Sequence, residues 1–179
     1  ELRERIKRAL DEHRRVSEEL ERRVREANKR HNEVSKEVKD DLKRSHDELR
    51  ESLERIKRRG DLSEEMEKKL RERLERSKRE IEKKEKENRD EHEKSRKKVE
   101  DKKRDNERRV KEMEDKIEKD GRVEEEDLKR IREETERLKE DVRRYLRELE
   151  KLSRDLRRKV EELLKDNKRK VKEIEDEAK

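Results

Sequence analysis

The chain has 179 residues, of which 67% are charged and 22% hydrophobic, and 63 basic residues nearly balance 57 acidic ones. It contains no cysteine, which excludes disulfides, thiolate nucleophiles and zinc sites of the cysteine type. No apolar run approaches the ~20 residues that a membrane-spanning helix needs, and no segment has the pattern of a signal-peptide core. We therefore expect a soluble protein without membrane contact, cytoplasmic on recombinant expression.

Low hydrophobicity with abundant charge is usual for disordered chains, but two features favour helices here. The net charge is only +6, so self-repulsion is weak. The strong helix formers Glu, Lys, Arg and Leu dominate, with two glycines and no proline to interrupt them. Basic and acidic residues alternate throughout, so no basic face accumulates, and we expect no specific nucleic-acid binding despite a pI near 9.3.

Two glycines divide the chain into near-equal thirds. Gly60 lies in "IKRRGDLSEEM" and Gly121 lies in "IEKDGRVEEEDL". Glycine just past a helix end adopts the left-handed conformation that other residues resist, so both positions predict helix ends. The predicted elements are helices over 2–58, 62–119 and 124–178, joined by turns over 59–61 and 120–123.

Acid-rich segments follow both glycines and predict the starts of the next two helices. Asp61 and Glu64 have the spacing of a capping box, and Ser63 competes with Asp61 as the N-cap. At the third helix, the run from Glu124 to Asp127 places four carboxylates at the positive end of the helix dipole.

The predicted fold is all-α: a single-chain antiparallel up-down-up three-helix bundle, forming a single domain over 1–179. Turns this short force consecutive helices to run antiparallel. Apolar residues of the first and third helices recur at spacings of three and four, the pattern of one buried face. Their average spacing near 3.6 predicts long, nearly straight helices with little supercoil. The second helix carries fewer apolar residues.

Uncharged polar residues fill the gaps in the apolar stripes. Residues 82–98, "EKKEKENRDEHEKSRKK", contain no aliphatic or aromatic side chain, yet Asn88, His92 and Ser95 are spaced four and three apart. That spacing puts the three residues on one stripe of a helix. Many such polar residues also recur after eighteen positions, which is five helical turns, so each pair faces the same direction.

Folding the chain at its two glycines brings these polar residues into three clusters, because positions equally distant from a turn become level with one another. The first predicted cluster contains His13, Ser17, Asn106 and Thr135. The second contains Asn28, His31, Asn88, His92 and Ser153, with Ser95 on the same inward face. The third contains Ser45, His46, Ser77 and Asn167.

We predict that these fourteen side chains hydrogen-bond to one another in a shared core. Buried amides, imidazoles and hydroxyls cost several kcal/mol when they lack partners. A network of this kind penalises shifted registers and wrong oligomers, because a slip would leave polar groups unpaired. The alternative is that the same residues are ordinary exposed positions on the helix surfaces.

The combination of features resembles de novo designed helical bundles of the parametric type with buried hydrogen-bond networks. It comprises equal helix lengths, the single-glycine loops "RRGDLSEE" and "EKDGRVEEE", a Glu/Lys/Arg surface and layered Asn, Ser, His and Thr. The resemblance covers the whole chain and implies a structural purpose, with no natural ligand and no natural compartment. Natural spectrin-like three-helix units share the outline, but they normally carry buried tryptophans, and this chain has none.

Three motifs suggest chemistry that the helical geometry disfavours. "SHD" at Ser45–Asp47 has the residue types of a catalytic triad, but consecutive helical residues point about 100° apart and cannot hydrogen-bond in series. His31 and His92 are the start of a zinc site, but the neighbouring Asn and Ser are poor ligands. We therefore expect no enzymatic activity, metal or cofactor. "RGDL" at Arg59–Leu62 matches the integrin-binding tripeptide, and we favour its explanation as a tight helix-ending turn.

The sequence therefore predicts a structural scaffold that needs no partner and whose polar layers specify register and topology. Three alternatives remain open. In a pH-responsive module, protonation near pH 5–6 would break hydrogen bonds that buried neutral histidines accept. In a self-assembling module, paired chains would bury the thin apolar seam of the second helix as a homo-oligomer. In the third alternative, the chain is a charged free-standing helix or spacer.

Overall fold

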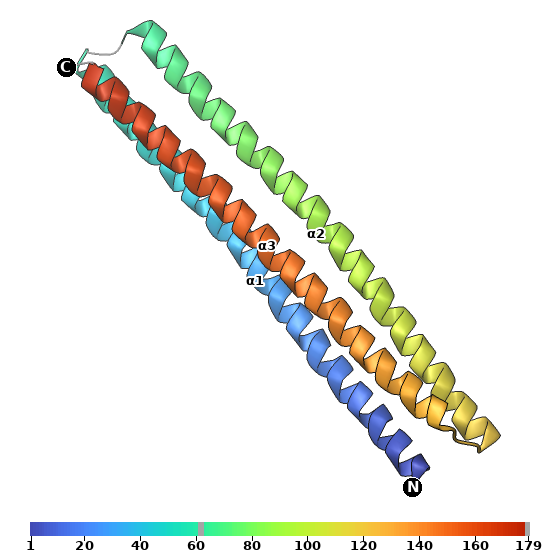
Figure 1. Ribbon diagram of the computed structural model, residues 1–179. Coiled ribbons are helices and arrows are strands. Elements are labelled where there is room, and N and C mark those ends of the chain that lie inside the picture. Colours follow the sequence, from blue (N-terminus) through green and yellow to red (C-terminus); the bar gives the residue numbers. More distant parts are fainter. Residues whose placement is uncertain (61–62, 178–179) are drawn as a thin grey trace. The chain divides into compact units, whose positions relative to one another are not determined.

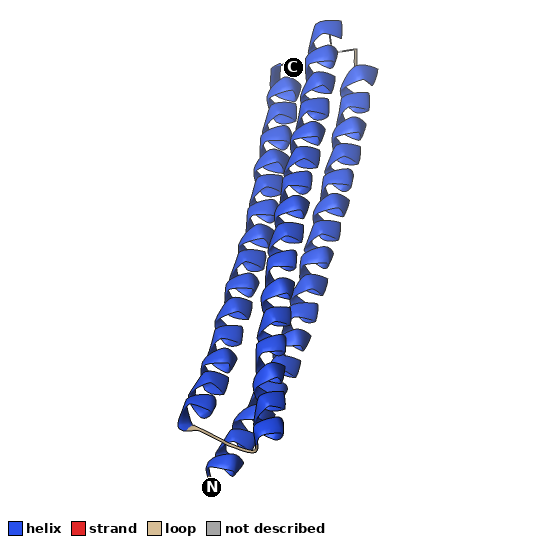
Figure 2. Ribbon diagram, turned by 90° about the vertical axis from the view of Figure 1, so that its right-hand side faces the viewer, coloured by secondary structure: helices blue, strands red, loops and turns tan. Residues whose placement is uncertain are grey.

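The computed structural model describes residues 1–60 and 63–177. They form three helices, α1 over Leu2–Arg58, α2 over Glu64–Asp120 and α3 over Glu125–Glu177 (Figure 1). The described residues contain no strand (Figure 2). Contacts join α1 to α3 and α2 to α3, so the prediction of an all-α three-helix bundle is confirmed.

Both glycines end their helices as the sequence predicts. Gly60 has a φ of 72° and Gly121 a φ of 64°, the left-handed conformation of a helix C-cap. The N–H of Gly60 donates to the carbonyl of Lys57 at 3.1 Å, and the N–H of Gly121 donates to the carbonyl of Ile117 at 3.0 Å. These bonds satisfy carbonyls that the helix ends would otherwise leave without a donor.

Side chains cap the starts of α2 and α3. The hydroxyl of Ser63 accepts a hydrogen bond from the N–H of Met66 at 3.2 Å, so Ser63 acts as the N-cap of α2. Asp61, the competing cap, lies outside the described residues, as does Leu62 of "RGDL". At α3 the Asp127 carboxylate accepts from the N–H of Glu124 at 3.0 Å, which places the helix start one residue later than predicted.

The chain forms two compact units, each containing a segment of all three helices. The first unit comprises residues 1–30 and 91–150, and the second comprises residues 31–90 and 151–179. The prediction of a single domain over 1–179 stays a prediction.

Ion pairs show the direction of the helices within the first unit. Arg14 of α1 pairs with Glu114 of α2 at 2.8 Å, and Glu21 pairs with Lys103 at 3.6 Å. From the first pair to the second, the residue number rises in α1 and falls in α2, so the two helices run antiparallel.

The second unit shows the same directions through other pairs. The α2 residues Ser77 and Glu80 contact the α3 residues Asn167 and Lys159, at 2.9 and 3.8 Å respectively, so the numbers again run in opposite directions. Lys57 of α1 pairs with Glu67 of α2 at 3.1 Å, which ties the two helices together beside the Gly60 turn.

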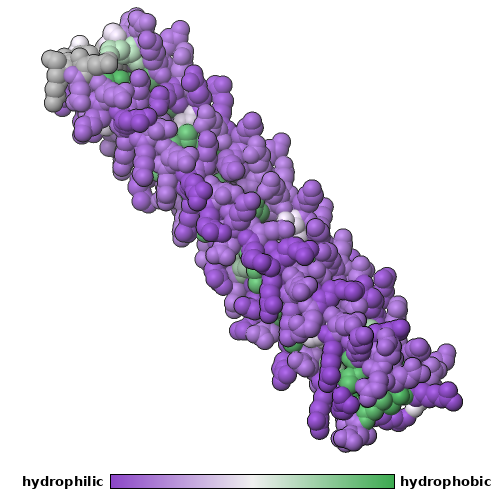
Figure 3. Space-filling view, viewed as in Figure 1, coloured by the Kyte–Doolittle hydropathy of each residue, from purple (hydrophilic) through white to green (hydrophobic). Residues whose placement is uncertain are grey.

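The two units bury the same number of apolar side chains, and few of these side chains belong to α2. Among the described residues, eleven apolar side chains are buried in each unit. Those of the first unit are Ile6, Ala9, Leu20, Val99, Val110, Leu128, Ile131, Leu138, Val142, Tyr145 and Leu149. Those of the second unit are Val38, Leu49, Leu53, Ile56, Leu70, Ile81, Leu152, Leu156, Val160, Val171 and Ile174. Only two side chains in each list belong to α2. The face of the molecule drawn in Figure 3 is mostly hydrophilic, with small hydrophobic patches.

Gly60→Ala is expected to lower the free energy of unfolding by about 1 kcal/mol, because alanine resists the left-handed conformation. A Cβ added at Gly60 meets no atom within 4 Å, so the loss would report backbone strain alone. Gly60→Asn is the matched control, since asparagine tolerates this conformation. Urea unfolding measures the effect, and equal midpoints for Gly60→Ala and the unmodified chain would contradict it.

Candidate functional site

Every one of the fourteen predicted polar side chains is at least half-buried, so the interpretation that they are exposed surface residues is wrong. Eight are buried: His13, His31, Ser45, Ser77, Asn88, Asn106, Thr135 and Asn167. Six are half-buried: Ser17, Asn28, His46, His92, Ser95 and Ser153. Burial removes their hydration, so the partner of each polar atom decides what that residue contributes.

In the first unit, His13, Asn106 and Glu134 form a chain of hydrogen bonds across all three helices. His13 Nε2 lies 2.7 Å from Asn106 Oδ1. Asn106 Nδ2 donates to the Glu134 backbone carbonyl at 2.7 Å and to Glu134 Oε2 at 3.0 Å. Because the Asn106 amide nitrogen is committed to Glu134, its oxygen must accept from His13. The Nε2 of His13 therefore carries a proton, which fixes the donor role of that nitrogen.

Glu134 anchors this chain and was not predicted from the sequence. The residue is only 7% exposed, and Arg109 holds both of its carboxylate oxygens, with Nε at 2.9 Å and Nη2 at 3.1 Å. Paired, charge-assisted contacts of this kind are the strong ones. Its place in the sequence could have indicated its burial. Glu134 follows Ile131 by three residues and precedes Leu138 by four, which is the spacing of the apolar stripe.

Ser17 and Thr135 were expected in this network, and both expectations are wrong. Thr135 is buried, but its hydroxyl donates to the carbonyl of Ile131 in its own helix at 3.0 Å. Such back-bonding satisfies a short hydroxyl locally, without a partner on another helix. Ser17 is only half-buried, and its hydroxyl reaches outward to Glu107 Oε1 at 3.3 Å.

A second group in the first unit joins Asn28, His92 and Tyr145, one residue from each helix. His92 Nε2 lies 3.1 Å from Asn28 Oδ1 and 3.2 Å from the Tyr145 hydroxyl oxygen. The Tyr145 hydroxyl itself donates to Asn28 Oδ1, so His92 Nε2 is the donor in both of its contacts. Burial raises the pKa of Tyr145 to about 12, which keeps the phenol protonated and able to donate.

His31, Asn88 and Ser153 belong to the second unit. Asn88 Nδ2 donates to the backbone carbonyl of Leu152 at 2.8 Å, and His31 Nδ1 lies 2.8 Å from the Ser153 hydroxyl. Burial lowers the pKa of His31, and a hydrogen bond with Asn88 acts in the opposite direction. The second predicted cluster is therefore divided between the units, because Asn28 and His92 belong to the first unit.

Ser95 does not join a polar network. It is half-buried, and within the described part of the chain its hydroxyl has no hydrogen bond. It lies instead in a shallow hollow of the first unit with Lys102 and Asp141, which form an ion pair at 3.5 Å. The spacing of three residues from His92 correctly predicted that Ser95 faces the core. It did not predict whether the hydroxyl would have a hydrogen-bond partner.

The third predicted cluster is only partly formed. Asn167 Nδ2 donates to the Ser77 hydroxyl at 2.9 Å. The Ser45 hydroxyl oxygen and His46 Nε2 are buried without a hydrogen-bond partner among the described residues, so the prediction that they join this cluster is wrong. Ser45 carries a short side chain, and His46 points about 100° away from it around the helix. For the same reason, "SHD" does not form the hydrogen-bonded series of a catalytic triad.

Charged neighbours surround His46 from two helices. Burial lowers the pKa of His46, and Arg50 and Lys78 lower it further. Asp47 and Glu75 act in the opposite direction. Folding therefore disfavours protonation of the His46 imidazole.

Glu85 is a second residue that sequence reasoning missed. Its Oε1 is buried without a hydrogen-bond partner in the described part of the second unit. Burial raises the pKa of Glu85, the cations of Lys39 and Arg89 lower it, and Glu82 raises it. Nothing in the sequence separates this glutamate from the many exposed ones.

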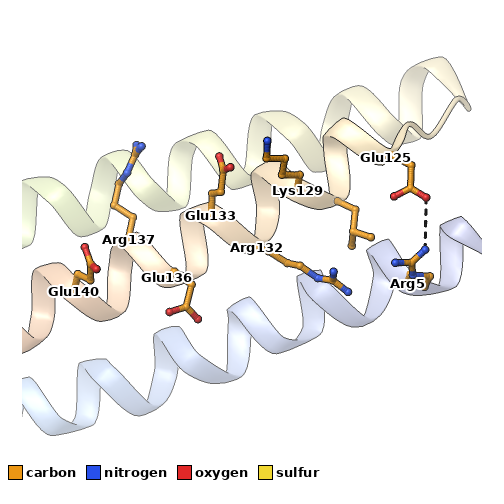
Figure 4. A pocket seen from close by; sticks show the side chains of 9 residues that line it. Arg5, Glu125, Lys129, Arg132, Glu133, Glu136, Arg137 and Glu140 are labelled. Atoms are coloured by element: carbon orange, nitrogen blue, oxygen red, sulfur yellow. Dashed lines mark ion pairs between the residues drawn. The ribbon is translucent and has the colours of Figure 1, made fainter.

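A groove of the first unit lies between the start of α1 and the first turns of α3 (Figure 4). Its volume is about 490 Å³, and an ion pair between Arg5 and Glu125 at 3.5 Å crosses it. Four basic and four acidic side chains surround Leu128 in its lining. Because these charges balance, the groove does not select a ligand of either sign.

Comparison with protein-family models, with curated proteins and with solved structures finds no match for this chain. Among the described residues, no group of three His, Cys, Asp or Glu side chains is placed to hold a metal ion. None of the described helices combines the length and the apolar character needed to cross a membrane. The function must be inferred from the buried polar groups themselves.

Glu134→Ala is expected to lower the free energy of unfolding by about 1–3 kcal/mol, because it removes charge-assisted hydrogen bonds and leaves their donors unpaired. Glu133→Ala is the matched control, since Glu133 is the exposed neighbour on the same helix and such changes usually stay within about 0.5 kcal/mol. Urea unfolding of both variants measures the difference, and equal losses would contradict the anchoring role of Glu134.

Proposed function

We propose that this protein is a structural scaffold of designed origin, whose buried hydrogen bonds fix which residues of the three helices lie level. The observation that carries the proposal is the chain from His13 through Asn106 to Glu134, which engages one residue of each helix. Each of these bonds needs one donor and one acceptor in one geometry. An apolar contact between two aliphatic side chains carries no such requirement.

The small apolar contribution of α2 explains why such bonds would be needed. This helix buries Val99 and Val110 in the first unit and Leu70 and Ile81 in the second. So few apolar contacts place little penalty on a helix that slides by one turn. A slide that moved Asn106 away from Glu134 would leave buried polar groups unpaired, at about 1–3 kcal/mol for each group.

Regularity supports the designed origin. The three helices contain 57, 57 and 53 residues, and each connection contains a single glycine with a positive φ. None of the described large hydrophobic side chains is exposed, as in a surface chosen position by position from Glu, Lys and Arg.

A double-mutant cycle at His13 and Asn106 tests the register function. Each single change, His13→Leu or Asn106→Leu, is expected to cost about 1–3 kcal/mol, because it leaves a buried polar partner unpaired. The double variant is expected to regain part of that loss, giving a coupling energy of about 1 kcal/mol or more. Urea unfolding measures the energies, and additive single losses would contradict the proposal.

The same variants test what the hydrogen bonds specify. Sedimentation of the unmodified chain is expected to give one species near 22.5 kDa, whereas the double variant, with an apolar pair in place of the polar one, is expected to give mixed oligomers. A stable dimer of the unmodified chain would instead support the self-assembling alternative. An extended monomer in small-angle scattering would support the spacer.

A second candidate function, a pH-responsive module, is favoured by the histidines of the second unit. Burial lowers the pKa of both His31 and His46 below 6.5. The unfolded chain then binds protons more readily than the folded one as the pH falls below 6.5. Their contribution to stability is complete above pH 6.5 and is lost as the pH falls through the lowered values.

Thermal unfolding at pH 7.5 and pH 5.0 tests this second function. The unmodified chain is expected to melt several degrees lower at pH 5.0, because His31 and His46 must be protonated against their burial. A chain carrying His31→Asn and His46→Gln is expected to show a smaller shift, and comparing the two chains cancels the contributions of the carboxylates. Equal shifts in both chains would exclude these histidines as the cause.

A further inference from the structure

The buried polar atoms without partners all fall in one unit. Among the described residues they are Ser45 Oγ, His46 Nε2 and Glu85 Oε1, and each belongs to the second unit. The apolar cores do not distinguish the units, because eleven apolar side chains are buried in each. The units differ instead in how their buried polar atoms are paired.

The buried polar side chains of the first unit all have hydrogen bonds. Those described as buried are His13, Asn106, Glu134 and Thr135, and each has a partner within that unit. His13 Nε2 donates to Asn106, and Arg109 holds the Glu134 carboxylate at the end of this chain of hydrogen bonds.

We propose that mild acid opens the second unit while the first unit stays folded. The inference rests on the pH-responsive function proposed above, and it names the part of the chain that responds. The segments expected to open are 31–58 of α1, 64–90 of α2 and 151–177 of α3. Cooperative opening of one compact unit while another stays folded is common, because local stabilities differ within a chain.

The surroundings of His46 explain why a proton there is unfavourable. Its charged neighbours on α1 are Asp47 and Arg50, and those on α2 are Glu75 and Lys78. Two cations and two carboxylates offer no net attraction to offset the loss of hydration. A protonated ring would also carry an N–H at Nε2, where the described residues provide no acceptor.

His31 is buried and hydrogen-bonded within the second unit. Its Nδ1 contacts the Ser153 hydroxyl at 2.8 Å, and Asn88 supplies a second hydrogen bond. Neither partner carries a charge that would stabilise an imidazolium. Burial opposes a charge on the His31 ring, because an imidazolium loses hydration when it is buried, and this lowers the pKa of His31.

Glu85 acts with the opposite sign and must be separated from the histidines. Its pKa is raised, so the buried carboxylate destabilises the folded chain at neutral pH, and that cost disappears as acid protonates it. Its charged neighbours are Lys39 of α1 with Glu82 and Arg89 of α2. A Glu85→Gln background removes this contribution and leaves the histidines as the titrating groups of interest.

Hydrogen exchange of the full chain tests the proposal, because it shows which peptides lose protection in acid. Peptides from both units are compared at pH 7.5 and pH 5.0 in the Glu85→Gln background, after correction for the intrinsic pH dependence of exchange. Peptides of the second unit are expected to lose protection by about fivefold or more at pH 5.0, and peptides of the first unit to change by less than about twofold. Equal loss in both units would overturn the inference while leaving the pH-responsive function intact. No loss in either unit would overturn both.

Matched variants assign the effect to particular histidines. His31→Asn with His46→Gln is expected to abolish the acid effect in the second unit. His13→Gln, which keeps a side-chain donor toward Asn106 in the first unit, is expected to leave that effect unchanged. If the double variant does not fold at pH 7.5, the half-buried His46→Gln is measured alone and is expected to reduce the effect. Loss of the acid effect in His13→Gln, or its persistence in the variants at residues 31 and 46, would overturn the proposal.

Discussion

Burying polar groups inside a bundle whose second helix has few apolar side chains is the constraint on which this structure depends. Every amide, imidazole or hydroxyl moved out of water needs a partner at hydrogen-bonding distance and in the right direction. The Asn106 amide meets this requirement fully, because its nitrogen donates twice to Glu134 and its oxygen accepts from His13. That single side chain joins segments of all three helices within the first unit.

The two units meet this constraint to different degrees. In the first unit a charged pair, Arg109 with Glu134, ends the hydrogen-bonded chain and holds it in place. In the second unit Asn88 and Asn167 have partners, whereas the buried Ser45 hydroxyl has none among the residues that the structure describes. Each unit buries eleven described apolar side chains, and the units differ in the pairing of their buried polar atoms. Both the proposed scaffold role and the proposed acid response follow from these same buried groups.

Much of the fold was predictable because local rules determine it. The positive φ of Gly60 and Gly121 favours glycine, and the lack of proline leaves the helices uninterrupted. The rule that residues equally distant from a turn lie level brought Asn28 opposite His92, which the structure confirms. The same rule predicted burial for residues in "EKKEKENRDEHEKSRKK", a stretch without any apolar side chain.

The sequence by itself determined where the helices end, which stripe of each helix faces inward and which polar residues lie in that stripe. Only the tertiary structure decided which atoms pair. It selected Glu134 from a surface full of similar carboxylates, gave Thr135 a partner in its own helix, and left Ser45 without a partner in the described part of the chain. The physical reason is the precision in position that each requires. Helical periodicity places a residue to within about a turn, whereas a hydrogen bond is made or lost over a few tenths of an ångström.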